Sequence, residues 1–397
     1  MTILQMFVCA SIYSLAVAAT YRVRGRRAAY FMLFFFGIFP ACSFSAISIT
    51  KDAIYSALFV LVVVLSFEIM SKRKAPRSEY VCYGIITTLF ILFRNNAIYY
   101  YIPWLLLAFL ILLKHKKHMR MVAINAVSIL LSVIINNTLI GATGAYEYQE
   151  QAAFSVPLQQ MLGTAIMHEK EEVPRKGEGG KMFDFFERDE LENKLPYSEI
   201  NADRAKLSIG KQITKDNKIG FLKAYIGAGA KYPNDYIRIF LRLTLCSWYP
   251  LSYDFAYFYG TSFAETSFFS GIVELMPNVR QNSKLPELKK FLDENWRNLG
   301  YRDNLIVNLI MAPATYTLSL LVILCYAAYR KRRKILILGL LIFLNYLCIL
   351  LSPGILLRYM WPIMFSVPLL GVLLYRPRRK ISKTLQKSQK SAIISPS

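Results

Sequence analysis

The sequence has few of the residues and motifs on which soluble enzymes most often depend. Its 397 residues include three histidines and six cysteines, and no two cysteines form a Cys-x-x-Cys pair. It has no Gly-x-x-x-x-Gly-Lys-Ser/Thr phosphate loop and no glycine-rich turn between a strand and a helix. These absences argue against a zinc site of the usual spacing, a disulfide framework and a cytosolic nucleotide-binding site.

Acidic residues are missing from five short clusters of lysine and arginine that separate the apolar runs. The chain has 48 basic and 25 acidic residues, a formal charge of +23, and half of its basic residues lie in these clusters. Short loops rich in lysine and arginine stay on the cytoplasmic side of a membrane. The rest of the chain is close to neutral, so no basic patch remains for a nucleic acid. The clusters lie at 22–27, 72–77, 114–120, 330–334 and 376–390.

Long apolar runs dominate the sequence. Apolar residues make up 55% of the chain, and its mean hydropathy is +0.35. A helix that crosses a bilayer needs about 20 mostly apolar residues. The sequence therefore predicts an all-α fold, a polytopic transmembrane helical bundle of about nine spans in the cell membrane. The spans are expected near 3–21, 28–48, 53–71, 80–93, 97–113, 121–140, 306–329, 335–352 and 359–375.

One long stretch lacks such runs and is predicted to be a large, mainly helical extracytoplasmic segment. An even number of crossings must separate successive cytoplasmic clusters, which puts the N-terminus outside and the C-terminus in the cytoplasm. Within the segment, the aromatic residues of 236–260 are typical of a membrane interface. The predicted parts are N-terminal transmembrane helices (1–140), the extracytoplasmic segment (141–305), C-terminal transmembrane helices (306–376) and a basic cytoplasmic tail (377–397).

Two charged residues, Lys51 and Asp52, interrupt apolar sequence at the predicted outer end of a span. Charges beside hydrocarbon are costly and often functional. Lys51 would bind a phosphate, and Asp52 would act as a base or bind a metal. The alternative is an ordinary helix start, with Thr50 or Asp52 as its cap.

A second polar site, Arg94-Asn95-Asn96, divides the long apolar stretch 80–113. Arg94 would bind a phosphate, and Asn95 and Asn96 would donate hydrogen bonds to sugar hydroxyls. The alternative is a plain hairpin turn, which asparagine favours.

Two further polar sites are weaker on pattern. Arg358 directly precedes the last apolar run and would clamp an anion, or it would anchor the helix end at the interface together with Tyr359 and Trp361. Gln160 follows the sixth run and would bind substrate, or it would belong to an amphipathic helix opened by Pro157.

The order of these short motifs resembles a poorly characterised group of bacterial multi-span proteins, found mostly in Gram-positive species. The group is similar to glycosyltransferases of the C superfamily, called GT-C. The resemblance covers about residues 35 to 362 and rests on motifs that are each weak alone. They are Ile49-Thr50-Lys51-Asp52, Phe93-Arg94-Asn95-Asn96, Phe154-Ser155-Val156-Pro157-Leu158-Gln159-Gln160, Tyr197 with Asp203 and Lys206, Lys231-Tyr232-Pro233 with Tyr236, Trp248-Tyr249-Pro250, and Arg358-Tyr359.

The resemblance implies transfer of a sugar from a polyprenyl-phosphate carrier to a cell-surface glycan acceptor on the outer face. The partners would then be the lipid bilayer, the lipid-linked sugar and the glycan. An inverting transfer needs a carboxylate base, and cations that neutralise the phosphate leaving group. Asp52 is the candidate base. Lys51, Arg94 and Arg358, or a divalent metal, would supply the positive charge.

One difference from the GT-C pattern concerns the base. Such proteins usually begin with a cytoplasmic end, a first span and then an external loop that carries a catalytic aspartate. The run at 3–21 looks instead like the second span, and residues 1–5 contain no acidic residue. We therefore expect either that the chain is N-terminally truncated or that the base lies elsewhere, with Asp52 as the nearest substitute.

Two other functions compete with sugar transfer. One is a transporter or flippase for lipid-linked glycans. The predicted spans hold few charges near mid-membrane, and the sequence shows no inverted repeat of broken helices, both of which argue against this function. The other is an inactive membrane scaffold, which the missing external loop would favour.

Overall fold

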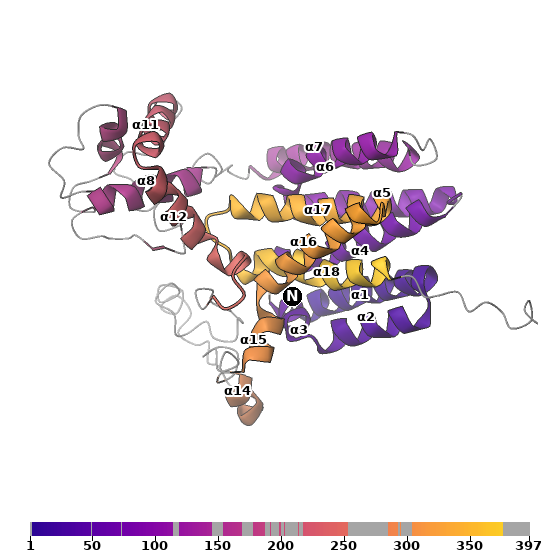
Figure 1. Cartoon of the computed structure of the whole chain (residues 1–397). Coiled ribbons are helices and arrows are strands. Elements are labelled where there is room, and N and C mark those ends of the chain that lie inside the picture. Colours follow the sequence, from indigo (N-terminus) through magenta and orange to yellow (C-terminus); the bar gives the residue numbers. More distant parts are fainter. Residues whose placement is uncertain are drawn as a thin grey trace, which may run out of the picture.

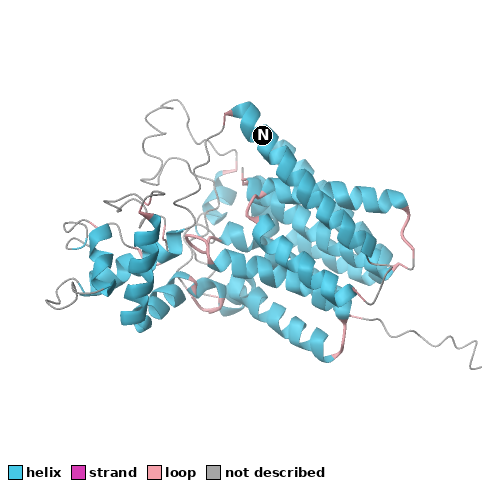
Figure 2. Ribbon diagram, turned by 90° about the horizontal axis from the view of Figure 1, so that it is seen from above, coloured by secondary structure: helices cyan, strands magenta, loops and turns pink. Residues whose placement is uncertain are grey.

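The computed structural model describes residues 2–48, 50–72, 74–113, 119–144, 154–168, 178–186, 191, 198–199, 202, 213, 217–252, 285–292, 294 and 304–375. The regular elements in these ranges are all helices, which confirms the predicted all-helical class (Figure 2). Most of them form one bundle, and a smaller group of helices stands off one end of it (Figure 1).

The bundle combines helices from the two ends of the chain. The N-terminal part contributes α1 (Thr2–Arg24), α2 (Arg26–Ile38), α3 (Pro40–Ile47), α4 (Lys51–Ser71), α5 (Arg77–Phe93), α6 (Ala97–Leu112) and α7 (Met119–Thr143). The C-terminal part contributes α15 (Leu305–Met311), α16 (Pro313–Tyr329), α17 (Arg333–Leu350) and α18 (Leu357–Leu374). Each predicted apolar run thus corresponds to one helix or to two consecutive helices.

Five of these helices, α1, α4, α7, α17 and α18, are long and apolar enough to cross a membrane. Two predicted runs are bent pairs instead, α2 with α3 at 57° and α15 with α16 at 66°. Pro40 and Pro313 open the second helix of each pair, because proline cannot continue the hydrogen bonds of the helix before it. Counting each bent pair as one span gives seven candidates. Helices α5 and α6 are only 17 and 16 residues long. The predicted number of nine crossings, which counts each of them as a span, therefore stays a prediction.

Helix α4 lies at the centre of the bundle. Its most apolar stretch is 89% buried inside the protein, whereas that of α7 is only 22% buried. It packs against α1, α5, α17 and α18. A helix that is apolar on all sides is stable in such a central position. The two ends of α4 therefore meet side chains from several other helices.

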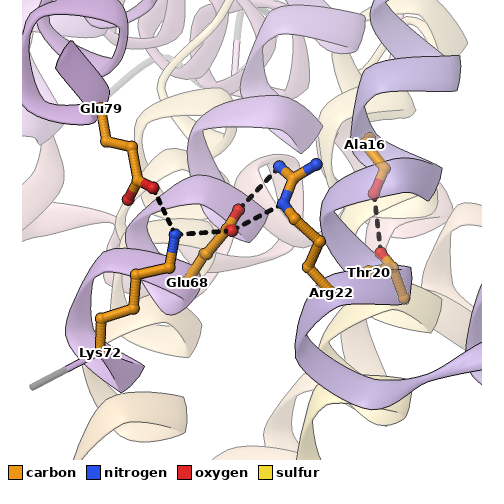
Figure 3. Close-up of polar contacts among 6 residues, drawn as sticks. All are labelled: Ala16, Thr20, Arg22, Glu68, Lys72 and Glu79. Carbon is orange, nitrogen blue, oxygen red and sulfur yellow. Dashed lines mark hydrogen bonds and ion pairs between the residues drawn. The ribbon is translucent and has the colours of Figure 1, made fainter. Parts of the chain in front are cut away.

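At one end of the bundle, which we call the basic end, Glu68 and Lys72 of α4 link this helix to α1 and α5 (Figure 3). Arg22 of α1 donates two hydrogen bonds to its carboxylate, at 2.7 and 2.9 Å. Lys72 lies 3.0 Å from Glu68 and 2.6 Å from Glu79 of α5. Arg24 also donates to the backbone carbonyl of Leu373, so the end of α18 is here too. The ends of α1, α4 and α18 and the start of α5 thus meet on one side, as the charge pattern predicts.

At the opposite end, which we call the far end, the chain reverses between α5 and α6 and between α17 and α18. Trp104 donates to the carbonyl of Ile337 at 2.8 Å, and Cys348 lies 4.0 Å from the carbonyl oxygen of Asn96. Helices α6 and α17 are therefore antiparallel. Ser128 of α7 donates to the carbonyl of Gly84 at 3.1 Å and Ser132 to that of Thr88 at 3.3 Å, so α5 and α7 are parallel. Tyr83 of α5 and Tyr101 of α6 both donate to Oδ1 of Asn125, so α6 turns back alongside α5, as in the predicted hairpin in 80–113.

The helices that stand off the far end have a small core of their own. They are α8 (Ser155–His168), the 3-10 helix η3 (Glu178–Phe185), α11 (Lys218–Lys231) and α12 (Pro233–Leu243). We call them the α8–α12 unit. Leu158, Met161 and Phe221 are fully buried between them. The described part of the predicted extracytoplasmic segment is thus mainly helical.

Two short helices complete the described part of this segment. The 3-10 helix η4 (Leu245–Ser247) follows α12, and α14 (Pro286–Leu292) begins at its proline as the sequence predicts. Leu288 and Phe291 lie in α14, whereas Trp296, expected on the same face, is outside the described residues. The basic tail after Tyr375 is also outside them.

Candidate functional site at the far end of the bundle

Asp52 lies in the first turn of α4 and is almost completely buried. The cap residue before it, Thr50, makes no side-chain hydrogen bond to the helix. The side chain of Asp52 is directed instead at two arginines from other parts of the chain. The capping interpretation therefore does not account for this carboxylate.

Arg94 and Arg358 approach Asp52 from two different reversals of the chain. Nη1 of Arg94 lies 3.4 Å from one carboxylate oxygen of Asp52, and Nε of Arg358 lies 3.6 Å from the other. Direct hydrogen bonds between such groups are shorter, about 2.7–2.9 Å. The three side chains thus form an ion cluster without tight hydrogen bonds, and it carries one excess positive charge. We call it the far-end cluster.

The guanidinium of Arg94 is held between two tyrosine rings. Its Cζ atom lies 4.7 Å from the ring centre of Tyr359 and 5.2 Å from that of Tyr55. The side chain is only 12% exposed, and the buried Nη1 makes no hydrogen bond to any residue that the structure describes. Burial by itself would lower the pKa of Arg94, but Tyr55 and Asp52 outweigh burial and raise it. Arg94 is therefore a fixed cation with an unused donor.

Two further polar side chains hold Tyr55 in place. Its hydroxyl is hydrogen-bonded to that of Tyr100 in α6 and donates to Oδ1 of Asn345 in α17 at 3.4 Å. Sequence reasoning missed Tyr55, Tyr100 and Asn345. A signal existed for Tyr55, which follows Asp52 by one helical turn, and for Asn345, a single amide within an apolar helix.

Other residues that the sequence singled out lie outside the far-end cluster. Lys51 precedes Asp52, but its side chain is exposed. Asn95 and Asn96 are exposed in the turn between α5 and α6, where Asn96 precedes α6 without a side-chain cap. The structure thus brings one charged residue of each of three predicted sites together, with Tyr359 beside them, and leaves Lys51, Asn95 and Asn96 exposed.

Gln160 has a different environment within the α8–α12 unit. It donates to the carbonyl of Tyr236 at 3.1 Å and accepts a hydrogen bond from Tyr225 at 2.8 Å. Burial raises the pKa of Tyr225, so its hydroxyl remains a donor. Gln160 joins α8, α11 and α12, and its amide is occupied by these contacts.

The charges of the far-end cluster do not fit a divalent metal. One carboxylate faces two guanidinium groups, which would repel a second cation. Among the residues that the structure describes, no group of three or more His, Cys, Asp or Glu side chains is placed to hold a metal ion. The positive charge near Asp52 comes from arginine, which favours an anion such as a phosphate.

The fold and the far-end cluster define a class: an all-helical, multi-span membrane protein with a buried ion cluster at one end of its bundle. The chain belongs to a family of unknown function, DUF6020, whose sequence profile matches residues 1–389. No curated protein and no solved structure matches the chain significantly.

Proposed function

We propose that the protein is a membrane glycosyltransferase of the GT-C type that uses a polyprenyl-phosphate-linked sugar and a cell-surface glycan acceptor. The observation that carries this proposal is the far-end cluster, in which the buried carboxylate of Asp52 faces Arg94 and Arg358. A base beside two cations is the set of charges that transfer from a phosphate carrier requires. The basic end, on the opposite side of the bundle, would face the cytoplasm.

The cluster divides the reaction between its members. The acceptor hydroxyl attacks the anomeric carbon of the sugar, and its proton passes to a carboxylate oxygen of Asp52. The bond from that carbon to the phosphate oxygen breaks, and its electron pair leaves with the polyprenyl phosphate. Arg94, through its unused Nη1, and Arg358, which is 44% exposed, stabilise the developing phosphate charge. Lys51, Asn95 and Asn96 lie at the rim, where an incoming sugar or acceptor would pass.

Binding of the carrier phosphate provides the first test. The purified full-length chain in nanodiscs is titrated with polyprenyl phosphate and with a polyprenol of equal length, and the melting temperature is followed. We expect the phosphate to raise it more than the alcohol does. Arg94→Lys retains the charge but loses the flat guanidinium that lies over the two tyrosines. In this variant, polyprenyl phosphate and polyprenol should therefore raise the melting temperature by nearly the same amount. Arg26→Ala removes an exposed arginine that lies over Tyr30 outside the cluster, and is the matched control.

Sugar transfer provides the second test. Membranes that contain the protein are supplied with radiolabelled polyprenyl-phosphate hexoses, and label is followed from the lipid extract into glycan. Removal of one donor that stabilises a developing charge costs about 100- to 1,000-fold in rate, so Arg94→Ala should abolish measurable transfer. Asp52→Asn should abolish transfer and leave phosphate binding in place. Equal stabilisation by polyprenol and polyprenyl phosphate, or wild-type transfer by Asp52→Asn, would rule the proposal out.

One observation favours the alternative of a transporter or flippase. The bends of the two broken pairs lie together, because the rings of Phe39 and Tyr316 are 6.0 Å apart. Broken helices of this kind form the substrate sites of many transporters. A transporter would move a fluorescent lipid-linked sugar between leaflets of a proteoliposome. It would do so equally well with Asp52→Asn, whereas the glycosyltransferase would not move the lipid at all.

A further inference from the structure

Helix α12 exposes an apolar column and a basic column side by side. Ile237 and Leu241 are 58% and 44% exposed, and Arg238 and Arg242 follow each of them and are also exposed. The opposite face of the helix is used for packing, since Tyr236, Ile239 and Leu243 are buried. The exposed columns therefore are not needed for the core of the α8–α12 unit.

Exposed aromatic and apolar residues also follow α12 in the chain. Trp248 and Tyr249 are 37% and 45% exposed, and Leu251 is 36% exposed. They follow the short helix η4, and the indole N–H of Trp248 donates to the hydroxyl of Thr244, the residue that caps the end of α12, at 3.3 Å. Large apolar side chains gathered in one place on a surface usually mark an interaction site. We call residues 237–251 the interface segment.

Two contacts with the bundle determine where this segment lies along the bundle axis. The hydroxyl of Ser247 lies 3.2 Å from that of Tyr346 near the end of α17, and Sγ of Cys246 lies 3.5 Å from the carbonyl oxygen of Ile355 before α18. Figure 1 shows α12 running from α8 toward this end of the bundle. Leu351, which ends α17, is itself 68% exposed. The interface segment thus lies beside the reversal between α17 and α18, at the far end of the bundle.

We infer that the interface segment is a membrane anchor that lies in the headgroup layer of the leaflet at the far end. Tryptophan and tyrosine are favoured at this depth, and amphipathic helices with arginine on the polar side bind there. Ile237, Leu241 and Trp248 reach the boundary of the acyl chains. Arg238 and Arg242 donate to phosphates of the lipid headgroups.

A lipid surface fits these residues better than another protein or a glycan does. The segment contacts the bundle at the reversal between α17 and α18, where the apolar helices end, and its two arginines match the charge of phosphate groups. Arg242 lies 3.8 Å from Glu199, but both side chains are about half exposed, so this pair is weak and leaves the arginine available. The anchor does not depend on sugar transfer, since it would hold the α8–α12 unit against the membrane in a transporter as well.

Trp248 allows a direct test in the full-length chain. Wild type and Trp248→Phe are reconstituted in phosphatidylcholine–phosphatidylglycerol nanodiscs, and the difference between their emission spectra isolates Trp248 from the other three tryptophans. The lipids carry bromine, a contact quencher, either near the headgroups or near the bilayer centre. We expect strong quenching of the Trp248 component by shallow bromine and little by deep bromine. No quenching at either depth would overturn the inference.

Removal of the two arginines provides the second test. In Arg238→Ala/Arg242→Ala the Trp248 component should shift to longer wavelength and lose shallow quenching, and the loss should be larger with phosphatidylglycerol than without it. Lys223→Ala removes an exposed charge from α11 of the same unit and should change nothing. A double variant that is quenched like wild type in both lipids would show that the arginines bind no headgroup. If shallow quenching is lost as the number of chains per nanodisc rises from one to two, the segment contacts a second copy of the chain instead.

Discussion

At the scale of single residues, Tyr359 is the contact that both arginines of the far-end cluster share. Arg94 lies over one part of its ring, Arg358 is 5.2 Å from the ring centre, and a nitrogen of Arg358 lies 3.4 Å from the Tyr359 hydroxyl. A guanidinium over an aromatic face has its flat surface covered and its N–H edge free. Tyr359 therefore acts as a positioning residue, which sets the direction in which Arg94 can donate.

Substitution of Tyr359 separates the role of the ring from that of the hydroxyl. A partly desolvated cation–π contact contributes about 1–2 kcal/mol, so Tyr359→Leu should weaken binding of polyprenyl phosphate by roughly tenfold. Tyr359→Phe retains the ring and should restore most of that affinity. The measurement is a titration of the full-length chain in nanodiscs, with polyprenol as the reference ligand. Equal affinities in both variants and in wild type would exclude a positioning role.

At the scale of elements, α4 connects the two ends of the bundle. It carries Asp52 in its first turn and Glu68 near its last turn, and both are buried. Glu68 ties α4 to α1 through Arg22, and Lys72 ties it to α5 through Glu79. A buried carboxylate in such a position is stable because it has cationic partners. Helix α4 thus has a buried carboxylate with cationic partners at each of its ends.

Glu68→Gln removes the charge of this connection and keeps its size. Hydrogen bonds to charged groups contribute about 1.5–3 kcal/mol, and Arg22 is half exposed, so we expect a loss of about 1–2 kcal/mol. The melting temperature in detergent should fall, and the difference from wild type should become smaller in high salt. Glu294→Gln, in an exposed pair 3.9 Å from Lys290, should have no measurable effect. A Glu68→Gln protein as stable as wild type would show that the three helices are held by apolar packing alone.

At the scale of the whole molecule, the lysine and arginine clusters of the sequence gather at one end of the bundle, where Lys334 also contacts Ser71. The basic end holds Arg22, Lys72 and Arg24, and the far end holds the cluster around Asp52. Since lysine and arginine near span ends favour the cytoplasm, this separation predicts one orientation in the membrane. It also requires the hairpin between α5 and α6 to reach the far side, although neither helix is long.

Cysteine labelling of intact cells tests the orientation and the hairpin together. In a chain whose six native cysteines are replaced, Asn95→Cys at the far end should react with a membrane-impermeant maleimide added outside. Arg26→Cys at the basic end should react only after the cells are permeabilised. The reverse pattern would invert the topology and place the far-end cluster in the cytoplasm. Labelling of both from outside would contradict the alternation of crossings.

The far-end cluster could be predicted only in part. Asp52, Arg94 and Arg358 stand out in sequence because each is a charge at the edge of an apolar run. No pattern shows that they meet, since they come from distant parts of the chain. Gln160 also stands out in sequence, as a polar residue that follows an apolar run. Its hydrogen bonds with Tyr225 and Tyr236, however, show that it holds three helices together.

The sequence by itself determined the helical class, the apolar runs and the basic end, because hydrophobic length and the placement of lysine and arginine are local properties of the chain. The tertiary structure alone decided which polar interruptions come together, that two runs bend at Pro40 and Pro313, and that α4 lies at the centre. Inside a membrane the hydrophobic effect does not choose between helix faces. Close packing and polar contacts such as that of Arg94 with Asp52 make that choice, and they join residues far apart in the sequence.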